Sequence, residues 1–284
     1  MKQFYNTYAS VRLNFRKSLQ LSKNEKNIIV SPLGTQFEDI SNSLLAKLSW
    51  THHRTIFARC KSEEEMEFYM KASIENNYTV RELDRQISAG FFERTMLSNS
   101  KLPNQLQSEN LDLIVPLKSS YIFEFLNLSE THNERELQHA LVQQMKDFIL
   151  ELGKDFIFIG EEYRLSVGNS DFFIDLLFFH RGLQCLVAFE LKADKFKPEY
   201  LGQLNFYLEA LDRDVRNQNE NPSIGVLLCK DKDQEVVEYA LSRTLSPTMV
   251  AEYQTQLPDK KLLQKKLHEL FENKEIENNL KEDL

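Results

Sequence analysis

The spacing of hydrophobic residues changes along the chain and divides it into two regions. Up to about residue 97 these residues recur every three to four positions, as at Phe4, Tyr8 and Val11, which is the spacing of an amphipathic helix. Farther along, short apolar runs such as residues 185–189 alternate with helical stretches. Such runs are typical of strands that helices cover on both faces. The pattern therefore predicts a helical region followed by an α/β domain with a mixed sheet.

The first region is expected to form a helical domain over residues 1–97, incomplete at its N-terminus because its first helix has no capping residue. Ser62 with Glu65 has the spacing of a capping box, in which side chains satisfy free N–H groups of the first turn. Thr79 with Glu82 repeats this spacing. Helices are expected over residues 1–20, 38–48, 50–60, 62–77 and 79–97.

Residues 98–131 lose this periodicity and contain Pro103 and Pro116, so we expect a linker there. A second domain is expected over residues 132–258, and residues 259–284, rich in Lys, Glu and Leu, predict a C-terminal helix. In the second domain we expect helices over residues 133–152, 198–213 and 233–241, and strands over residues 156–167, 171–180, 185–191 and 223–229.

Three charged residues interrupt the apolar strands of the second domain. Asp175 lies within one strand, and Glu190 and Lys192 occupy alternate positions of the next, so both point to one face. Burying a carboxylate in such a strand is costly unless the carboxylate is paired or binds a metal. A buried salt bridge at the end of the sheet is the simpler alternative for Glu190 and Lys192, but it leaves Asp175 unexplained.

These residues have the chemistry of a magnesium-dependent phosphodiesterase. The carboxylates of Asp175 and Glu190 and the main-chain carbonyl of Leu191 are hard ligands suited to Mg²⁺, with water completing the coordination. Such an ion acidifies a bound water and neutralises charge on a phosphate. Lys192 is expected to orient or deprotonate that water and to stabilise the phosphate in the transition state.

The segments around these residues resemble the C-terminal domain of the YhcG-like proteins, which belong to the PD-(D/E)XK nuclease superfamily. The resemblance is carried by the runs FIDLLFFH (173–180), ELK (190–192), FKPEY (196–200) and GQLNFY (202–207), and it continues through residues 221–230 and 244–247. In the first region, residues 48–52 and 80–87 resemble the helical domain that precedes the nuclease domain in the same family. The resemblance implies an αβββαβ restriction-endonuclease-like core with a mixed sheet.

By this resemblance Asp175 and Glu190 are metal ligands, with Mg²⁺ as the ion and Mn²⁺ as its alternative, and Lys192 assists the nucleophilic water. Gln203 and Tyr207 resemble the Gln-x-x-x-Tyr element of RecB-type members, which lies on the helix beside the metal. Their four-residue spacing places both on one helical face, which supports the same assignment independently. The alternative is a solvated glutamine one turn from a core tyrosine.

The chain departs from the family pattern on the first core helix. Superfamily members usually carry a glutamate there, whereas this chain has Leu137 followed by Gln138. We expect Glu136 as the substitute acid, although a solvated helical acid is the simpler explanation of that residue. The departure favours one alternative to an active nuclease, a nucleic-acid-binding or assembly module with a degenerate nuclease fold.

The net charge of −8 neither supports nor excludes nucleic acid as a partner, because the charge is unevenly distributed. Residues 1–118 carry 16 basic and 13 acidic residues, and residues 119–284 carry 19 basic and 30 acidic residues. A solvated charged face is the alternative to DNA contact in the first region, because acidic residues are interleaved with the arginines. The candidates for phosphate contact there are Arg54, Arg59, Arg81 and Arg85.

Composition predicts a cytoplasmic protein without a membrane span. Apolar runs stay well short of the roughly 18 residues that a span requires, and the N-terminus lacks a signal-peptide core. The 3 cysteines are far apart in the sequence and indicate neither a disulfide framework nor a zinc site. We therefore predict a magnesium-dependent nuclease acting on DNA, in repair, recombination or defence against foreign DNA. Self-association, or a protein partner, is expected to involve the helical domain or the C-terminal helix.

Overall fold

The computed structural model describes residues 47–99, 117–242, 244 and 246–269. The chain divides into two compact units, residues 1–87 and residues 88–284, which are described separately. The helix expected over residues 1–20, most of that over residues 38–48 and the end of that over residues 259–284 lie outside the described residues. In the part of the chain that is described, no helix is both long enough and apolar enough to cross a membrane.

The first unit is helical, as predicted. One residue from each of its helices, Ile56, Tyr69 and Leu83, is fully buried, as expected for amphipathic helices that pack on one another. Tyr69 also donates a hydrogen bond from its hydroxyl group to the main-chain oxygen of Gln86 at 3.3 Å. The helices described in this unit are α3 (Trp50–Arg59), α4 (Glu63–Glu75) and α5 (Val80–Ser88).

Side-chain caps set the starts of α4 and α5, and one glycine sets an end. Ser62 Oγ accepts a hydrogen bond from Glu65 N at 3.1 Å, so α4 begins at the predicted cap. The helix expected over residues 79–97 is wrong as a single element. After α5, Gly90 takes a left-handed φ of 62°, and α6 (Phe91–Asn99) then begins in the second unit. Glycine adopts this conformation without steric cost, which explains the break.

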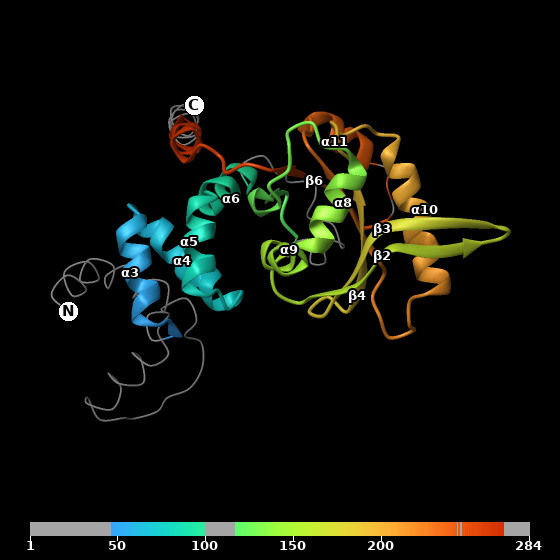
Figure 1. Cartoon of the computed structure of the whole chain (residues 1–284), viewed down its shortest axis with the longest axis horizontal. Helices are drawn as coiled ribbons and strands as arrows, with labels where there is room; N and C mark the ends of the chain where they lie inside the picture. Colours follow the sequence, from blue (N-terminus) through green and yellow to red (C-terminus); the bar gives the residue numbers. More distant parts are fainter. Residues whose placement is uncertain (1–46, 100–116, 243, 245, 270–284) are drawn as a thin grey trace, which may run out of the picture. The chain divides into compact units, whose positions relative to one another are not determined.

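The second unit is built around a mixed sheet. Its strands are β1 (Ser120–Ile122), β2 (Phe156–Val167), β3 (Ser170–His180), β4 (Cys185–Leu191), β5 (Ile224–Cys229) and β6 (Thr248–Gln254). Within the described residues the sheet has 6 strands in the order β1-β6-β5-β4-β3-β2 (Figure 1). β2, β3 and β4 run antiparallel, whereas β4, β5, β6 and β1 run parallel.

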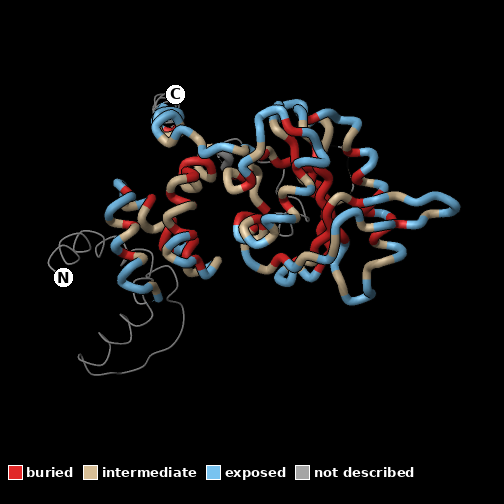
Figure 2. The backbone as a smooth tube through the Cα atoms, viewed as in Figure 1, coloured by how far each residue is buried: buried red, intermediate tan, exposed pale blue. Residues whose placement is uncertain are grey.

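Helices cover both faces of this sheet (Figure 1). On one face lie α8 (Glu134–Gln143) and α9 (Met145–Leu152), and on the other lie α10 (Tyr200–Asp214) and α11 (Gln234–Leu241). Every residue of β4 and β5 is buried, which gives the red centre of Figure 2. The predicted αβββαβ order, the mixed sheet and its fully buried central strands are therefore confirmed.

Several elements differ from the prediction. The helix expected over residues 133–152 is two helices, because the backbone of Gln144 (φ −104°, ψ 33°) leaves the helical region between them. The pattern does not predict β1 or β6. β1 lies in the segment expected as a linker and pairs with β6 through Ser120 and Glu252. Residues 260–269 are helical, where the C-terminal helix is expected to begin. The domain boundaries stay a prediction.

Gly225 allows α10 to lie close on β5. A Cβ atom at this position would lie 2.9 Å from two side-chain atoms of Leu204 and 3.1 Å from Leu208, which is closer than carbon atoms pack. The absence of a side chain at Gly225 thus sets the depth at which α10 meets the sheet. It also sets the height of Gln203 and Tyr207 above the strands.

Candidate active site

The antiparallel pair of β3 and β4 brings the three charged residues of the sequence prediction together. β3 pairs with β4 from Leu176 onward, so Asp175 lies where this pairing ends. Asp175 Oδ2 accepts a hydrogen bond from Leu191 N at 2.7 Å. Lys192 Nζ donates to Glu190 Oε1 at 2.9 Å. Two carboxylates and one ammonium group thus lie together where β4 ends beside β3, in the interior of the sheet.

Burial makes this group of charges costly. Glu190 is 2% exposed and Lys192 is 9% exposed. Glu190 Oε2 is buried and has no hydrogen-bond partner among the described residues. A buried polar atom without a partner costs about 1–3 kcal/mol, and a charged one costs more. A ligand that reached Glu190 Oε2 would remove this cost, so the fold leaves a position for one.

A third carboxylate reaches the site from α8. Glu134 Oε2 lies 3.4 Å from Lys192 Nζ, and Gln138, one turn later on the same face, donates from Nε2 to the main-chain oxygen of Asp175 at 2.9 Å. The residue expected in this place, Glu136, is engaged elsewhere. Its carboxylate accepts from Asn133 N, and its own N–H donates to Asn133 Oδ1, both at 2.9 Å, so it closes a capping box.

The acid of α8 that lies beside Lys192 is thus Glu134, on another face of the helix from the predicted Glu136. Residues two apart on a helix point in different directions, whereas residues four apart share a face. The signal that identifies Glu134 is its four-residue spacing from Gln138, together with Asn133 as the helix cap.

Burial has the largest effect on each shifted pKa at this site, and a neighbouring carboxylate has the second largest effect on those of Glu190 and Lys192. Burial raises the pKa of Asp175, and the hydrogen bond from Leu191 N opposes this rise only in part. Burial, and then the charge of Asp175, raise the pKa of Glu190 to about 7. Burial alone would lower the pKa of Lys192, but Glu190, Glu134 and Asp175 outweigh that effect and raise it. Among the described residues, three carboxylates face one ammonium group.

The backbone is distorted at Asp175. Ile174 packs in the core cluster on the α10 side and Leu176 in the cluster on the α8 side, although residues two apart on a regular strand share a face. The strand therefore rotates at Asp175. Opposite this point, between Glu161 and Tyr163 of β2, Glu162 has a φ of 45°, which is uncommon for a residue other than glycine. Such local distortions re-aim side chains and are frequent beside functional sites.

The structure joins the two residues predicted on α10. Gln203 Nε2 donates to the hydroxyl oxygen of Tyr207 at 2.6 Å, and Tyr207 is 4% exposed. Burial raises the pKa of Tyr207, and the charges of Glu190 and Asp175 raise it further. Gln203 and Tyr207 thus form one polar pair within electrostatic range of the two strand acids.

The arginines of the first unit serve partly in ion pairs. Arg59 Nη1 lies 3.1 Å from Asp84 Oδ1, and Arg85 Nη1 lies 3.1 Å from Glu82 Oε1. These contacts support the alternative of a charged face for Arg59 and Arg85. The other two candidates, Arg54 and Arg81, are exposed.

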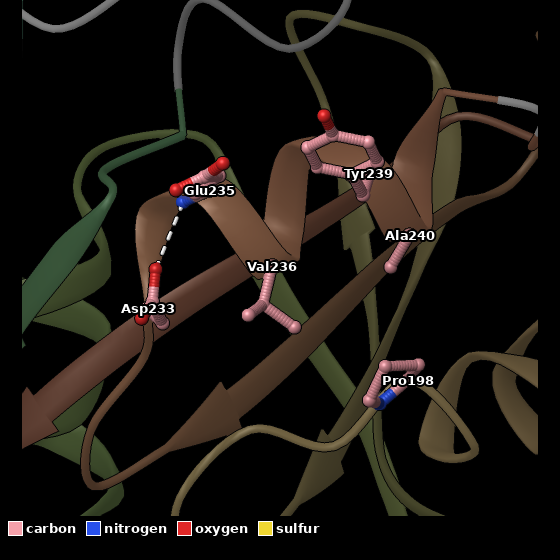
Figure 3. A pocket seen from close by; sticks show the side chains of 6 residues that line it. All are labelled: Pro198, Asp233, Glu235, Val236, Tyr239 and Ala240. Atoms are coloured by element: carbon pink, nitrogen blue, oxygen red, sulfur yellow. Dashed lines mark hydrogen bonds between the residues drawn. The ribbon is translucent and has the colours of Figure 1, made fainter.

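A shallow groove of about 420 Å³ lies between α11 and the loop at Pro198 (Figure 3). Val236 and Ala240 point toward Pro198 across it. Asp233 Oδ1 accepts a hydrogen bond from Glu235 N at 3.1 Å, so this acid caps α11. The carboxylates of β3 and β4 are not part of its lining, and we do not assign the groove to the site.

The residues of the site fit a divalent cation. In the described part of the chain, His, Cys, Asp and Glu side chains nowhere form a group of three or more that could hold a metal. Mg²⁺ does not require such a group, because it usually retains several waters and binds through one or two carboxylates. Asp175 and Glu190 supply two, Glu190 Oε2 lacks a partner, and the excess of negative charge favours a cation.

The fold and these residues together define the class of PD-(D/E)XK nuclease domains. Residues 115–268 match the family described as the YhcG PDDEXK nuclease domain, and residues 1–94 match the DUF1016 N-terminal domain. The chain belongs to the YhcG PDDEXK nuclease family, so the resemblance seen in the sequence is confirmed.

A curated relative and two solved structures resemble the chain. The Escherichia coli (strain K12) protein named "Putative nuclease YhcG" is 38% identical over 207 residues, which cover 72% of this chain and 55% of that protein. The chain thus spans about half the length of this relative. A repair endonuclease from Pyrococcus abyssi has a TM-score of 0.31 at 16% identity, covering 46% of this chain and 50% of the other. The EndoMS-dsDNA2 complex has a TM-score of 0.31 at 15% identity, covering 46% and 47%.

Proposed function

We propose that this protein hydrolyses phosphodiester bonds of DNA with the help of a divalent cation, Mg²⁺ or Mn²⁺. The observation that carries the proposal is the group formed by the half-buried Asp175 and the buried Glu190 and Lys192, in which carboxylates exceed ammonium groups. Asp175, Glu190 and the main-chain carbonyl of Leu191 would hold the ion. When bound there, the ion would supply positive charge for the phosphate and acidify a water molecule.

The other residues would prepare the substrate for attack. Lys192 donates its N–H groups to Glu190 and Glu134, so it is placed as a donor that can also bind a phosphate oxygen and offset its growing charge. We replace Glu136 with Glu134 as the acid of α8, which orients Lys192. Gln138 holds the backbone of β3 through the carbonyl of Asp175.

Gln203 and Tyr207 complete the proposed site on α10. The hydrogen bond between them leaves the carbonyl oxygen of the Gln203 side chain free to accept from a water or a nucleotide. In the first unit, the exposed Arg54 and Arg81 remain candidates for phosphate contact, ahead of the paired Arg59 and Arg85. The cytoplasmic location, a role in repair, recombination or defence, and assembly through helical segments stay predictions.

The test removes one charge at a time from the site by a change that keeps the size of the side chain. Asp175→Asn keeps an acceptor for Leu191 N but removes the charge, and Lys192→Met keeps the stem but removes the ammonium group. We expect both to lower cleavage of labelled DNA by at least about a thousandfold in Mg²⁺ or Mn²⁺. Mg²⁺ should raise the thermal midpoint of the unchanged protein and not that of Asp175→Asn.

Two further variants decide which acid of α8 takes part. Glu134→Gln should lower cleavage by about tenfold, whereas Glu136→Gln should cost only a little stability through the weakened cap. Full cleavage by both Asp175→Asn and Lys192→Met would refute the proposed function. Substrate panels of single-stranded DNA, double-stranded DNA and RNA would define the nucleic acid that is cut.

A second function is favoured by one observation. Gln138 stands where the family pattern has an acid, and its amide is already committed to the backbone of β3. The fold would then serve as a nucleic-acid-binding or assembly module without turnover. In that case DNA binding should persist while cleavage stays absent in every divalent cation, and Mg²⁺ should leave the thermal midpoint unchanged.

A further inference from the structure

Tyr200, the first residue of α10, places an aromatic ring against Lys192. Lys192 Nζ lies 5.2 Å from the centre of the Tyr200 ring, within the range of a cation–π interaction. The same ammonium group contacts Glu190 at 2.9 Å and Glu134 at 3.4 Å. Two carboxylates and the face of one aromatic ring therefore fix the position of the Lys192 ammonium group. The sequence alone assigned no role to Tyr200.

Tyr200 is itself fixed by its neighbours. Its hydroxyl group donates to the carboxylate of Asp194, at 3.1 Å to Oδ1 and 3.3 Å to Oδ2. Lys197 Nζ donates to Asp194 Oδ2 at 2.9 Å and lies 5.5 Å from the centre of the same ring. A tyrosine held at both its hydroxyl group and its face has little freedom to turn.

The loop before Tyr200 is anchored to the sheet. Phe196 N donates to the main-chain oxygen of Asp231 at 2.8 Å, and Lys230 N donates to the main-chain oxygen of Asp194 at 3.1 Å. Phe196 is 5% exposed and belongs to the core on the α10 side. The position of Tyr200 over Lys192 is thus set by the backbone as well as by side chains.

We propose that Tyr200 is a positioning residue that keeps Lys192 directed at the substrate phosphate while Glu190 is engaged with a divalent cation. This inference rests on the proposed function. Glu190 cannot give its full charge to both Lys192 and an ion, so its hold on Lys192 weakens when an ion binds. The Tyr200 ring attracts the ammonium group without neutralising it, so the charge of Lys192 remains available to a phosphate oxygen.

The experiment separates the ring of Tyr200 from its hydroxyl group. Tyr200→Phe keeps the ring over Lys192 and loses the bond to Asp194, whereas Tyr200→Leu loses the ring. Tyr239→Leu on α11 is the matched control, because Tyr239 is 76% exposed and lies outside the site. Each variant is compared for kcat and KM on DNA in Mg²⁺, for the thermal shift caused by Mg²⁺, and for circular dichroism.

Tyr200→Leu should lower kcat by about tenfold, the upper range for one desolvated cation–π contact, and leave KM within about twofold. The kcat of Tyr200→Phe should stay within about threefold of that of the unchanged protein. The kcat of Tyr239→Leu should equal that of the unchanged protein. The Mg²⁺ shift should persist in all of them. Equal loss of kcat in Tyr200→Phe and Tyr200→Leu, or no loss in Tyr200→Leu, overturns the inference.

A second measurement does not depend on cleavage. Acetic anhydride is added in the presence of Mg²⁺, and the acetylation of Lys192 is followed by mass spectrometry of its peptide. Lys192 should react severalfold faster in Tyr200→Leu than in the unchanged protein or in Tyr200→Phe, and equal rates in all three overturn the inference. If the unchanged protein cuts no nucleic acid, the proposed function fails while this measurement still tests the role of Tyr200.

Discussion

The two units use charge in opposite ways. In the first unit each paired arginine has its own acid. Arg59 pairs with Asp84 between side chains that are 44% and 47% exposed, and Arg85 pairs with Glu82. The Arg59 pair lies on a solvated surface and contributes little to stability. The Arg85–Glu82 pair is largely buried, with side chains 18% and 7% exposed, but its charges are matched one to one.

In the second unit Glu190 and Lys192 are buried, Asp175 is half-buried and Glu134 is exposed, and the charges are unequal in number. Asp175, Glu190 and Glu134 surround Lys192, and one oxygen of Glu190 has no partner in the described part of the chain. The comparison teaches that the presence of charge does not mark the candidate site. The imbalance of charge around the buried pair of Glu190 and Lys192 is what distinguishes it.

Removal of the single ammonium group should test this imbalance most strongly. Lys192→Met leaves the carboxylates of Asp175, Glu190 and Glu134 without their counter-charge. Urea unfolding in EDTA near pH 8 should show a loss of roughly 3 kcal/mol in the free energy of unfolding. Mg²⁺ should restore part of this loss. Unchanged stability in EDTA would mean that the acids carry no excess charge in the folded state.

Restoring an acid on α8 should have the next largest effect. Gln138→Glu loses the N–H donor to the carbonyl of Asp175 and adds a fourth carboxylate. The free energy of unfolding in EDTA should fall by about 1.5 kcal/mol, and the thermal shift caused by Mg²⁺ should grow. Gln143→Glu, on the same helix but exposed, is the control. Equal effects of the two changes would contradict a specific role of Gln138.

The pH dependence of stability should carry a smaller signature of the same imbalance. Burial, and then the charge of Asp175, raise the pKa of Glu190 from 4.5 to about 7 in the folded state. The folded state therefore binds this proton more tightly than the unfolded state. The resulting stabilisation is full below about pH 4.5 and is lost as the pH rises through about 7. Glu190→Gln should remove this pH dependence from thermal midpoints measured in EDTA. If the midpoints of the two proteins changed with pH in parallel, the assignment to Glu190 would be contradicted.

The smallest effect is expected in the first unit. Arg59→Met removes an exposed ion pair, so the free energy of unfolding should change by no more than about 0.5 kcal/mol, and salt should reduce the change further. A loss as large as that of Lys192→Met would abolish the distinction between the two units. Urea unfolding at low and high salt provides the measurement.

Much of the second unit was predictable because its strands are nearly all apolar. In such strands each charged residue is conspicuous, and alternation placed Glu190 and Lys192 on one face. The position of Asp175 beside them depended on the pairing of β3 with β4. β1 was not predictable, since three residues are too few to show a pattern and its partner strand lies more than a hundred residues later.

The direction of a helical side chain was harder to predict than its presence on a helix. A shift of one residue turns a side chain by about 100° around the axis, so the choice between Glu134 and Glu136 depended on the helix register. That register is set by Asn133, whose hydrogen bonds with Glu136 were not recognised as a cap. The break at Gly90 depended likewise on one backbone conformation.

The rotation of β3 at Asp175 has a mechanical consequence. On the N-terminal side of this residue β3 does not pair with β4, and β2 and β3 continue as a two-stranded ribbon (Figure 1). The ribbon leaves the rest of the sheet at the position where Glu162 of β2 lies opposite Asp175 of β3. We expect substitutions that change the twist of the ribbon to change the orientation of the Asp175 carboxylate without contacting it.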